Sequence, residues 1–287
     1  LTDDQVDAAL GSPAFGALIT EMRRAEANRH DLDQLMPRLV HVRGFEDAAS
    51  CKRFLSPSLG DLRDPHEMLG IREAACRLAD AIETGESIGI FSDYDVDGVC
   101  SAALLYRFLV RLGLKAPAVF IPQRNLDGYG LSRRGITELH QKGVSLLVSA
   151  DCGINAHEAV DYALSLGLDV IVTDHHEPED KLPPALAILN PKQPGCAFQG
   201  EDLCGAGVIF HLIVALRSEL RRRGRTELPN LRQDLVLVAL ATVADVVALS
   251  GQNRILVKEG LNVMNSLGCP GTTALARSAG IRHGILA

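Results

Sequence analysis

The sequence predicts an α/β protein: a parallel β-sheet flanked by helices, preceded by a mainly helical N-terminal extension. From residue 87 onward, short β-branched runs alternate with helical stretches, which is the pattern of βαβ units. The composition agrees, because 47% of the 287 residues are hydrophobic but only 4% are aromatic and none is Trp. A core of this kind is built from aliphatic side chains packed between helices and strands.

The first 80 residues read as mostly helical and contain no pattern that suggests chemistry. Apolar residues recur at helical spacing over Ile71–Ile82, and Ser56-Pro57-Ser58 and Asp64-Pro65 mark loops.

The sheet region contains five predicted strands, at Ser87–Phe91, Ala118–Ile121, Ser145–Ser149, Asp169–Thr173 and Ala185–Leu189. Helices are predicted between and after them, at Val99–Leu112, Ser132–Lys142, Asn155–Leu166, Gly207–Arg223, Leu231–Leu249 and Asn253–Ser266. Gly113, Gly143 and Gly167 stand where helix-ending glycines belong, and Asn155 with Glu158 has the form of a capping box.

Several classes of protein are disfavoured by bulk properties. No apolar run approaches the roughly 18 to 20 residues that span a bilayer, and the acidic start lacks a signal-peptide pattern, so we expect a cytoplasmic protein without a membrane partner. The seven Cys are scattered without a C-x-x-C, which argues against a disulfide framework or a structural zinc site. The net charge of −7 weighs mildly against nucleic acid, although a cation-binding carboxylate cluster would inflate it.

Acidic and imidazole side chains follow three of the predicted strands. Ligands of open α/β sheets bind at the carboxyl ends of the strands, so these side chains should face one crevice. The first strand leads to Asp93, Asp95 and Asp97, the third to Asp151, and the fourth to Asp174, His175 and His176.

Carboxylates crowded in one place repel one another unless a cation neutralises them. A mixture of Asp oxygens and a His nitrogen suits Mn²⁺ or Mg²⁺, with Mn²⁺ favoured by the imidazole. Five or more ligands exceed what one such ion draws from protein, so we expect two divalent metal ions, about 3.5 to 4 Å apart and bridged by one carboxylate.

Each piece also has a structural interpretation. A single Asp after a strand is more often a turn or a helix cap, and adjacent histidines can belong to a surface loop. Asp245 lies in an apolar helical stretch, where a salt bridge is as good an explanation as a metal. Gly205-x-Gly207 is better explained by close helix packing than by dinucleotide binding, and Arg221–Arg225 by a solvated helix end than by nucleic-acid contact.

Four segments resemble, in order, the motifs of the DHH phosphoesterase superfamily: Asp93–Gly98, Ala150–Ile154, Thr173–Glu177 and Val243–Val247. The first motif and residues 121–131 are most similar to its single-strand-specific exonucleases. The resemblance implies that Asp95, Asp97, Asp151, His175 and Asp245 hold the metals, with Asp151 bridging. It further implies a supporting acid at Asp93, a histidine-orienting acid at Asp174, and substrate contacts from His176, Arg124 and Tyr129.

The resemblance therefore implies hydrolysis at the 5′ end of single-stranded DNA, releasing mononucleotides in repair and recombination. A single-strand-binding protein or a helicase would be a further partner. The implied domains are a helical extension at 1–80, the catalytic domain at 81–266, and the start of a linker to a further domain at 267–287. Alternatives are a DHH enzyme acting on small nucleotides, with the same ligands, and a non-catalytic replication scaffold, which decayed ligands would mark.

Overall fold

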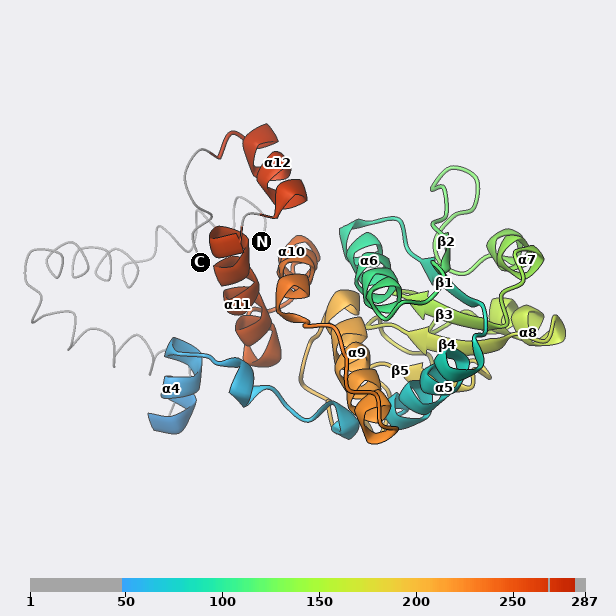
Figure 1. Cartoon of the computed structure of the whole chain (residues 1–287), viewed down its shortest axis with the longest axis horizontal. Helices are drawn as coiled ribbons and strands as arrows, with labels where there is room; N and C mark the ends of the chain where they lie inside the picture. Colours follow the sequence, from blue (N-terminus) through green and yellow to red (C-terminus); the bar gives the residue numbers. More distant parts are fainter. Residues whose placement is uncertain (1–47, 268, 282–287) are drawn as a thin grey trace, which may run out of the picture. The chain divides into compact units, whose positions relative to one another are not determined.

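The computed structural model describes residues 48–267 and 269–281 (Figure 1). The chain divides into a unit of residues 1–56 and a larger unit of residues 57–287. In the first unit the described element is the helix α4 (Ala48–Leu55). Residues 1–47, for which a mainly helical extension is predicted, lie outside the described residues.

The larger unit contains a five-stranded parallel sheet with the strand order β2-β1-β3-β4-β5. The strands β1 and β3 are buried along their whole length, as expected for central strands with helices on both faces. The predicted fold class is therefore confirmed, with strand ends within two residues of those predicted. The strands are β1 (Ile88–Ser92), β2 (Ala118–Phe120), β3 (Leu146–Ala150), β4 (Asp169–Thr173) and β5 (Ala187–Leu189).

Helices cover both faces of the sheet (Figure 1). One face packs against α5 (Ile71–Thr84), α6 (Val96–Arg111) and α9 (Gly205–Arg222), and the other against α7 (Arg133–Gln141) and α8 (His157–Ser165). Behind α6 and α9 lies α10 (Leu235–Ala244), which also packs against α11 (Gly251–Leu267). The remaining elements are the 3₁₀ turns η1 (Leu59–Asp61), η2 (Pro65–Glu67) and η3 (Arg232–Asp234), and the helix α12 (Pro270–Ser278), which falls within the predicted linker.

The strand order places a topological switch point between β1 and β3. The chain leaves β1 through α6 toward β2 on one side, then returns through α7 to β3 on the other. The helices that follow β1 and β3 are α6 and α8, which lie on opposite faces of the sheet, so the loops that lead to them diverge at the carboxyl ends of these strands. Ligands of open α/β sheets bind at such a switch point, and the predicted site residues begin there.

The opposite end of the sheet is tied together by arginines. Arg77 of α5 donates to Glu86, just before β1, over 2.6 Å and to Asp169 of β4 over 2.7 Å. Arg223 reaches from the end of α9 to Asp80 of α5 over 2.6 Å. Helix α5 thus continues across the predicted boundary at residue 80 and packs on the sheet.

The predicted helix Leu231–Leu249 is wrong as a single element. It divides into η3 and α10, and α10 ends at Ala244 with Asp245 as its C-cap. The next residue, Val246, has a left-handed φ of 60°. The sequence gives no sign of this helix end, because the apolar run contains no Gly, Asn or Pro, the residues that normally mark the end of a helix.

The predicted capping box at Asn155 is also wrong. Helix α8 begins at His157, and its N-cap residue, Ala156, offers no side-chain cap. Asn155 instead donates to the carbonyl of Glu177 over 3.0 Å and accepts from the N–H of Glu179 over 2.9 Å. It therefore fastens the loop that follows β4.

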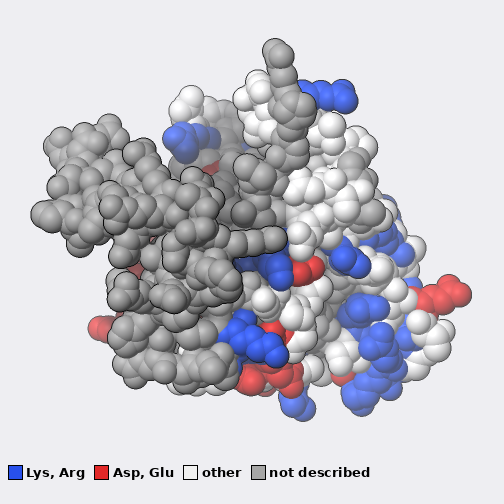
Figure 2. Space-filling view, turned by 90° about the vertical axis from the view of Figure 1, so that its left-hand side faces the viewer, with Lys and Arg blue, Asp and Glu red and all other residues white. Residues whose placement is uncertain are grey.

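The described surface mixes both charges. On the face shown in Figure 2, Lys and Arg side chains lie close to Asp and Glu, and several basic side chains gather at the lower right. Among the described residues, no helix combines the length and hydrophobicity needed to cross a bilayer.

Candidate metal centre

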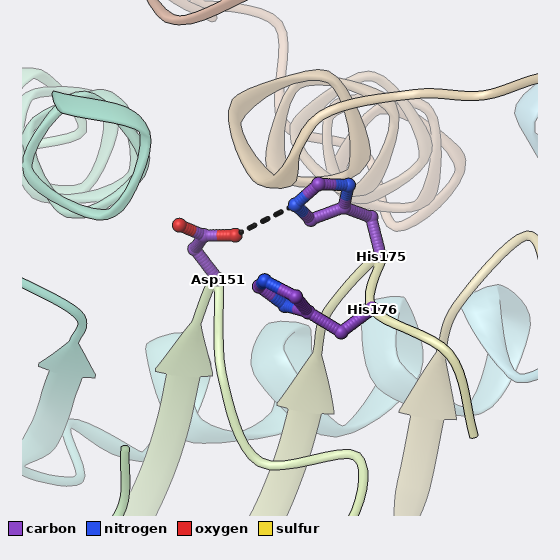
Figure 3. A group of neighbouring side chains, drawn as sticks. All are labelled: Asp151, His175 and His176. Atoms are coloured by element: carbon purple, nitrogen blue, oxygen red, sulfur yellow. Dashed lines mark ion pairs between the residues drawn. The ribbon is translucent and has the colours of Figure 1, made fainter. Parts of the chain in front are cut away.

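The predicted ligands converge at the carboxyl ends of the central strands. Asp151 is the first residue after β3 and His175 the second after β4, and Figure 3 shows both side chains above the strand ends, with His176 beside them. Asp97 comes from the first turn of α6, and Asp245 from the end of α10. Four separate segments of the chain thus supply one cluster.

His175 lies at the middle of this cluster. Its Nε2 atom is 3.2 Å from Asp151 Oδ1, 3.7 Å from Asp97 Oδ2 and 3.6 Å from Asp245 Oδ2. None of these approaches has hydrogen-bond geometry, since both ring nitrogens of His175 and Asp151 Oδ1 are buried without a hydrogen-bond partner. Buried polar atoms are normally satisfied, so atoms left bare and facing one another suit a metal ion.

The ligand atoms form three overlapping groups in which all members lie within 4.8 Å of one another. Asp151 belongs to two of the groups, and so does His175. Such overlap is expected where neighbouring ions share a ligand. The groups are Asp151, His175 and His176; Asp97, His175 and Asp245; and Asp93, Asp95 and Asp151.

Asp95 and Asp97 have different surroundings. Asp95 is exposed and caps α6, accepting from the N–H of Gly98 over 2.9 Å, so it is a helix cap as well as a member of a ligand group. Asp97 is buried and accepts two backbone hydrogen bonds, over 2.5 Å from Gly205 and 2.8 Å from Ala206.

The electrostatics of the cluster favour a cation. Burial, together with the charges of Asp97 and Asp95, raises the pKa of Asp151 to about 10. Burial likewise raises the pKa values of Asp93, Asp97 and Asp245. A divalent ion reverses this effect because it stabilises the ionised carboxylates that hold it. Oxygen-rich donors with one imidazole fit Mn²⁺ or Mg²⁺.

The backbone is strained at two places in the site. Among the described residues, Asp151 with φ 66° and Val246 with φ 60° are the non-glycine residues of positive φ. One is a predicted ligand and the other follows Asp245. Such conformations cost free energy and concentrate at functional sites, where the surrounding structure holds them.

Asp174 and His176 form a pair beside the cluster. The Asp174 carboxylate accepts from the N–H groups of Ile154, His175 and His176, and lies 2.7 Å from Nδ1 of His176. Although burial opposes it, hydrogen bonding by His176 lowers the pKa of Asp174, and the same bond raises the pKa of His176. The side chain of His176 is 45% exposed, and the hydroxyl of Tyr129 lies 3.3 Å from its ring nitrogens.

Arg124 lies in the loop between β2 and α7. Its guanidinium is 4.6 Å from the ring centroid of Tyr94, which separates Asp93 from Asp95. The loop is braced where Arg134 donates to Asp127 over 2.5 Å. The structure thus brings an exposed arginine next to the first acidic motif.

Two contributors to the site escape prediction. Gly205, interpreted as a helix-packing residue, contacts Asp97 and Asp151. Asn155, interpreted as a cap, fastens residues 177 and 179 beside His176. The sequence signal for Gly205 is its place at a helix start, but nothing in the sequence pairs it with an acid 108 residues earlier.

Residues 87–242 match the model of the DHH family, N-terminal domain. Because this match covers more than half of the chain, the chain belongs to the DHH family, as the four motifs predict. The chain is 38% identical to the single-stranded-DNA-specific exonuclease RecJ of Escherichia coli over 270 residues, covering 90% of this chain and 46% of the relative. It is 39% identical to RecJ of Bacillus subtilis over 246 residues, covering 86% of this chain and 30% of the relative.

Solved structures agree with the sequence relatives. A manganese-bound exonuclease RecJ superposes with a TM-score of 0.66 at 38% identity, covering 75% of this chain and 53% of the other. RecJ of Thermus thermophilus in complex with Mn²⁺ gives 0.67 at 36% identity, covering 84% of this chain and 33% of the other. The chain spans less than half the length of the curated relatives named above.

Proposed function

We propose that the chain hydrolyses phosphodiesters at the 5′ end of single-stranded DNA and releases 5′-mononucleotides, in repair and recombination. The observation that supports this most is the convergence of Asp97, Asp151, His175 and Asp245 in a chain similar to RecJ exonucleases. Such a role would place the protein in the cytoplasm. A single-strand-binding protein or a helicase as partner stays a prediction.

The proposed cofactors are two divalent metal ions, with Mn²⁺ favoured and Mg²⁺ as the alternative. Solved relatives are described in complex with one or the other. We assign Asp95, Asp97, Asp151, His175 and Asp245 as ligands. Asp151 and His175 each belong to two of the ligand groups, and we assign the bridge to Asp151 because a carboxylate has two oxygens to offer. When bound, the ions supply a lowered pKa for the attacking water and charge neutralisation at the phosphate oxygens.

Three residues of the chain would act on the substrate or support the site. His176, which lies 2.7 Å from Asp174 and whose pKa that hydrogen bond raises, would donate a hydrogen bond to a non-bridging phosphate oxygen, where negative charge develops in the transition state. Tyr129 packs edge-to-face against the His176 ring, with 5.8 Å between the ring centroids, and would contact the same nucleotide. Asp93, buried with Oδ1 lacking a hydrogen-bond partner, would support the site as an outer acid.

Arg124 would hold the terminal phosphate of the strand. A planar guanidinium matches a phosphate through two parallel hydrogen bonds. In the structure it stacks on Tyr94 and is exposed, so the guanidinium edge is free to reach an anion beside the first motif.

The test is an incubation with Mn²⁺ and a 5′-labelled single strand, in parallel with a duplex, a dinucleotide and a cyclic dinucleotide. Release of labelled mononucleotide from the single strand, but not from the duplex, is the expected result. Turnover of the small substrates alone would replace this proposal by a small-nucleotide phosphoesterase, and no turnover at all would favour a scaffold.

Two variants show whether the measured activity comes from this site or from a contaminating nuclease. Asp151→Asn should lose at least about a hundredfold in activity, since it removes the bridging charge. Asp161→Asn changes an exposed acid on α8 and should keep wild-type activity. Full activity in the Asp151 variant would contradict the two-metal assignment.

A further inference from the structure

Helix α9 begins without a cap of its own. Its N-cap residue, Cys204, makes no side-chain cap hydrogen bond, although the first N–H groups of a helix have no partner within it. The N–H groups of Gly205 and Ala206 donate instead to Asp97, to Oδ2 over 2.5 Å and to Oδ1 over 2.8 Å. An acid from α6 thus caps α9, and both of its oxygens are fixed.

The same helix end touches a second ligand. A Cβ atom at Gly205 would lie 2.6 Å from both Cβ and Oδ1 of Asp151. This is well inside the roughly 3.5 to 4.0 Å of a carbon contact, so no side chain fits there. The φ of Gly205 is not positive, and its conformation is open to any residue. The glycine is therefore required by the proximity of Asp151 and not by the backbone.

We propose that the start of α9, residues 205 and 206, is the positioning element of the metal centre. It contributes no ligand itself, but it fixes the Asp97 carboxylate through two N–H groups and sets how closely Asp151 approaches. It thereby couples an acid of α6, which it hydrogen-bonds, to an acid that follows β3, which it contacts. This inference rests on the metal centre of the proposed function.

Asp97 keeps acceptor capacity for a metal in this arrangement. Each carboxylate oxygen has two lone pairs, and each receives one N–H here. Groups that hydrogen-bond a metal-binding carboxylate hold its orientation, and their loss typically costs about 10- to 100-fold in metal affinity.

The alternative is that Gly205 serves only to pack α9 against the sheet. Gly207 provides a matched control, because it lies in the same helical turn with an ordinary φ. A Cβ there would be 3.3 Å from Cδ2 and 3.4 Å from Cβ of Leu203, so its nearest neighbours belong to that leucine and not to an acid of the site. Both substitutions exchange glycine for alanine in the first turn of the same helix, so the preference of helices for alanine, about 1 kcal/mol in a helix interior, acts in the same direction in both variants.

The experiment compares Gly205→Ala with Gly207→Ala in the whole chain, without nucleic acid. Binding of Mn²⁺ is measured by titration calorimetry and by the electron paramagnetic resonance spectrum of the bound ion, and the fold by far-ultraviolet circular dichroism. We expect Gly205→Ala to weaken Mn²⁺ binding about 10- to 100-fold with an altered spectrum, and Gly207→Ala to change it less than about 3-fold. Equal, wild-type-like binding in both variants would overturn the proposal.

A second measurement does not require a stable Gly205 variant. Amide hydrogen exchange at residues 205 and 206 is compared between the wild type and Asp97→Ala. Since Asp97 is the acceptor of both amides, their exchange should accelerate at least about tenfold while that of residues 210–216 stays slow. Unchanged exchange at 205 and 206 would show that Asp97 does not cap the helix, and would also overturn the proposal.

The outcome is distinguishable from failure of the proposed function. A chain that binds Mn²⁺ and responds to Gly205→Ala, but cleaves no single strand, would keep the positioning element and lose the exonuclease. A wild type that binds no Mn²⁺ would refute both.

Discussion

Replacing Asp151 by Asn tests whether this carboxylate is crowded in a site made for cations. Asn has the same shape and tolerates the left-handed conformation, here φ 66°, as well as Asp does. The substitution therefore removes the charge and changes little else. In metal-free protein the variant should be more stable than the wild type, and in the presence of Mn²⁺ the order should reverse.

The magnitude follows from the pKa. Burial, with the charges of Asp97 and Asp95, raises the pKa of Asp151 from its ordinary 3.8 to about 10 in the folded, metal-free chain. Since the folded value is the higher one, the stability from this group is fully present below about pH 4 and is lost as the pH rises toward about 10. Between the ordinary pKa of 3.8 and about pH 7 the pH rises by roughly 3 units. Each unit costs about 1.36 kcal/mol of folding free energy, so the loss at neutral pH has an upper limit of about 4 kcal/mol. We expect a gain of about 1 to 4 kcal/mol for metal-free Asp151→Asn.

The assay is urea unfolding followed by circular dichroism, because the chain has no Trp to report by fluorescence. Curves are recorded with a chelator at several pH values between about 5 and 9, and again with saturating Mn²⁺. The wild type should lose stability with rising pH when metal-free and regain it with Mn²⁺, whereas the variant should show a weaker dependence on both. A metal-free variant less stable than the wild type at neutral pH, or equal stabilisation of both proteins by Mn²⁺, would refute the reasoning.

Three further predictions concern other parts of the chain. Val246→Gly should raise the free energy of unfolding by about 1 kcal/mol, because glycine adopts the left-handed φ of 60° without strain; lower stability in the same urea assay would contradict this. Arg124→Lys keeps the charge but loses the bidentate fork, so the preference in kcat/KM for 5′-phosphorylated over 5′-hydroxyl strands should fall about tenfold; an unchanged ratio would remove Arg124 from the terminal phosphate. Hydrogen bonds from Arg222 and Arg223 lower the pKa of Glu219 to about 2. The stability that Glu219 gives the fold is therefore present above about pH 4.5 and lost as the pH falls toward about 2. Glu219→Gln should cost about 1 kcal/mol at neutral pH, since Arg222 is exposed, and should flatten acid unfolding between about pH 5 and 3; a slope like the wild type's there would contradict it.

The site residues at strand ends could be predicted from the sequence, because a strand and the residues that follow it form one continuous segment of the chain. Asp151 and His175 each come two residues after the end of a predicted strand, and the parallel arrangement then brings them to one edge. Asp245 is different, because it follows a helix whose end has no sequence signal. It required the family motif, and the structure brings it within 3.6 Å of His175.

Contacts between distant segments are not readable in the same way. The bond from Gly205 to Asp97 joins positions 108 residues apart, and neither residue type is unusual at a helix start. Asn155 has the local form of a cap but bonds to residues 177 and 179, since the loop after β4 passes close to it. In both cases a polar group forms a hydrogen bond with a residue distant in sequence and not with a neighbour in its own segment, and the local sequence pattern does not show this.

The two strained residues of the site, Asp151 and Val246, destabilise the metal-free fold, so their presence needs an explanation other than stability. Asp151 combines a left-handed φ with burial that raises its pKa, and both features cost free energy in the metal-free chain. Val246 adds a strained, exposed, β-branched residue next to Asp245. A chain selected for stability alone would favour Gly or Asn at both positions. Their retention is best explained if the strain holds Asp151 and Asp245 in the geometry that a bound ion stabilises, which Val246→Gly tests through weaker Mn²⁺ binding in a more stable protein.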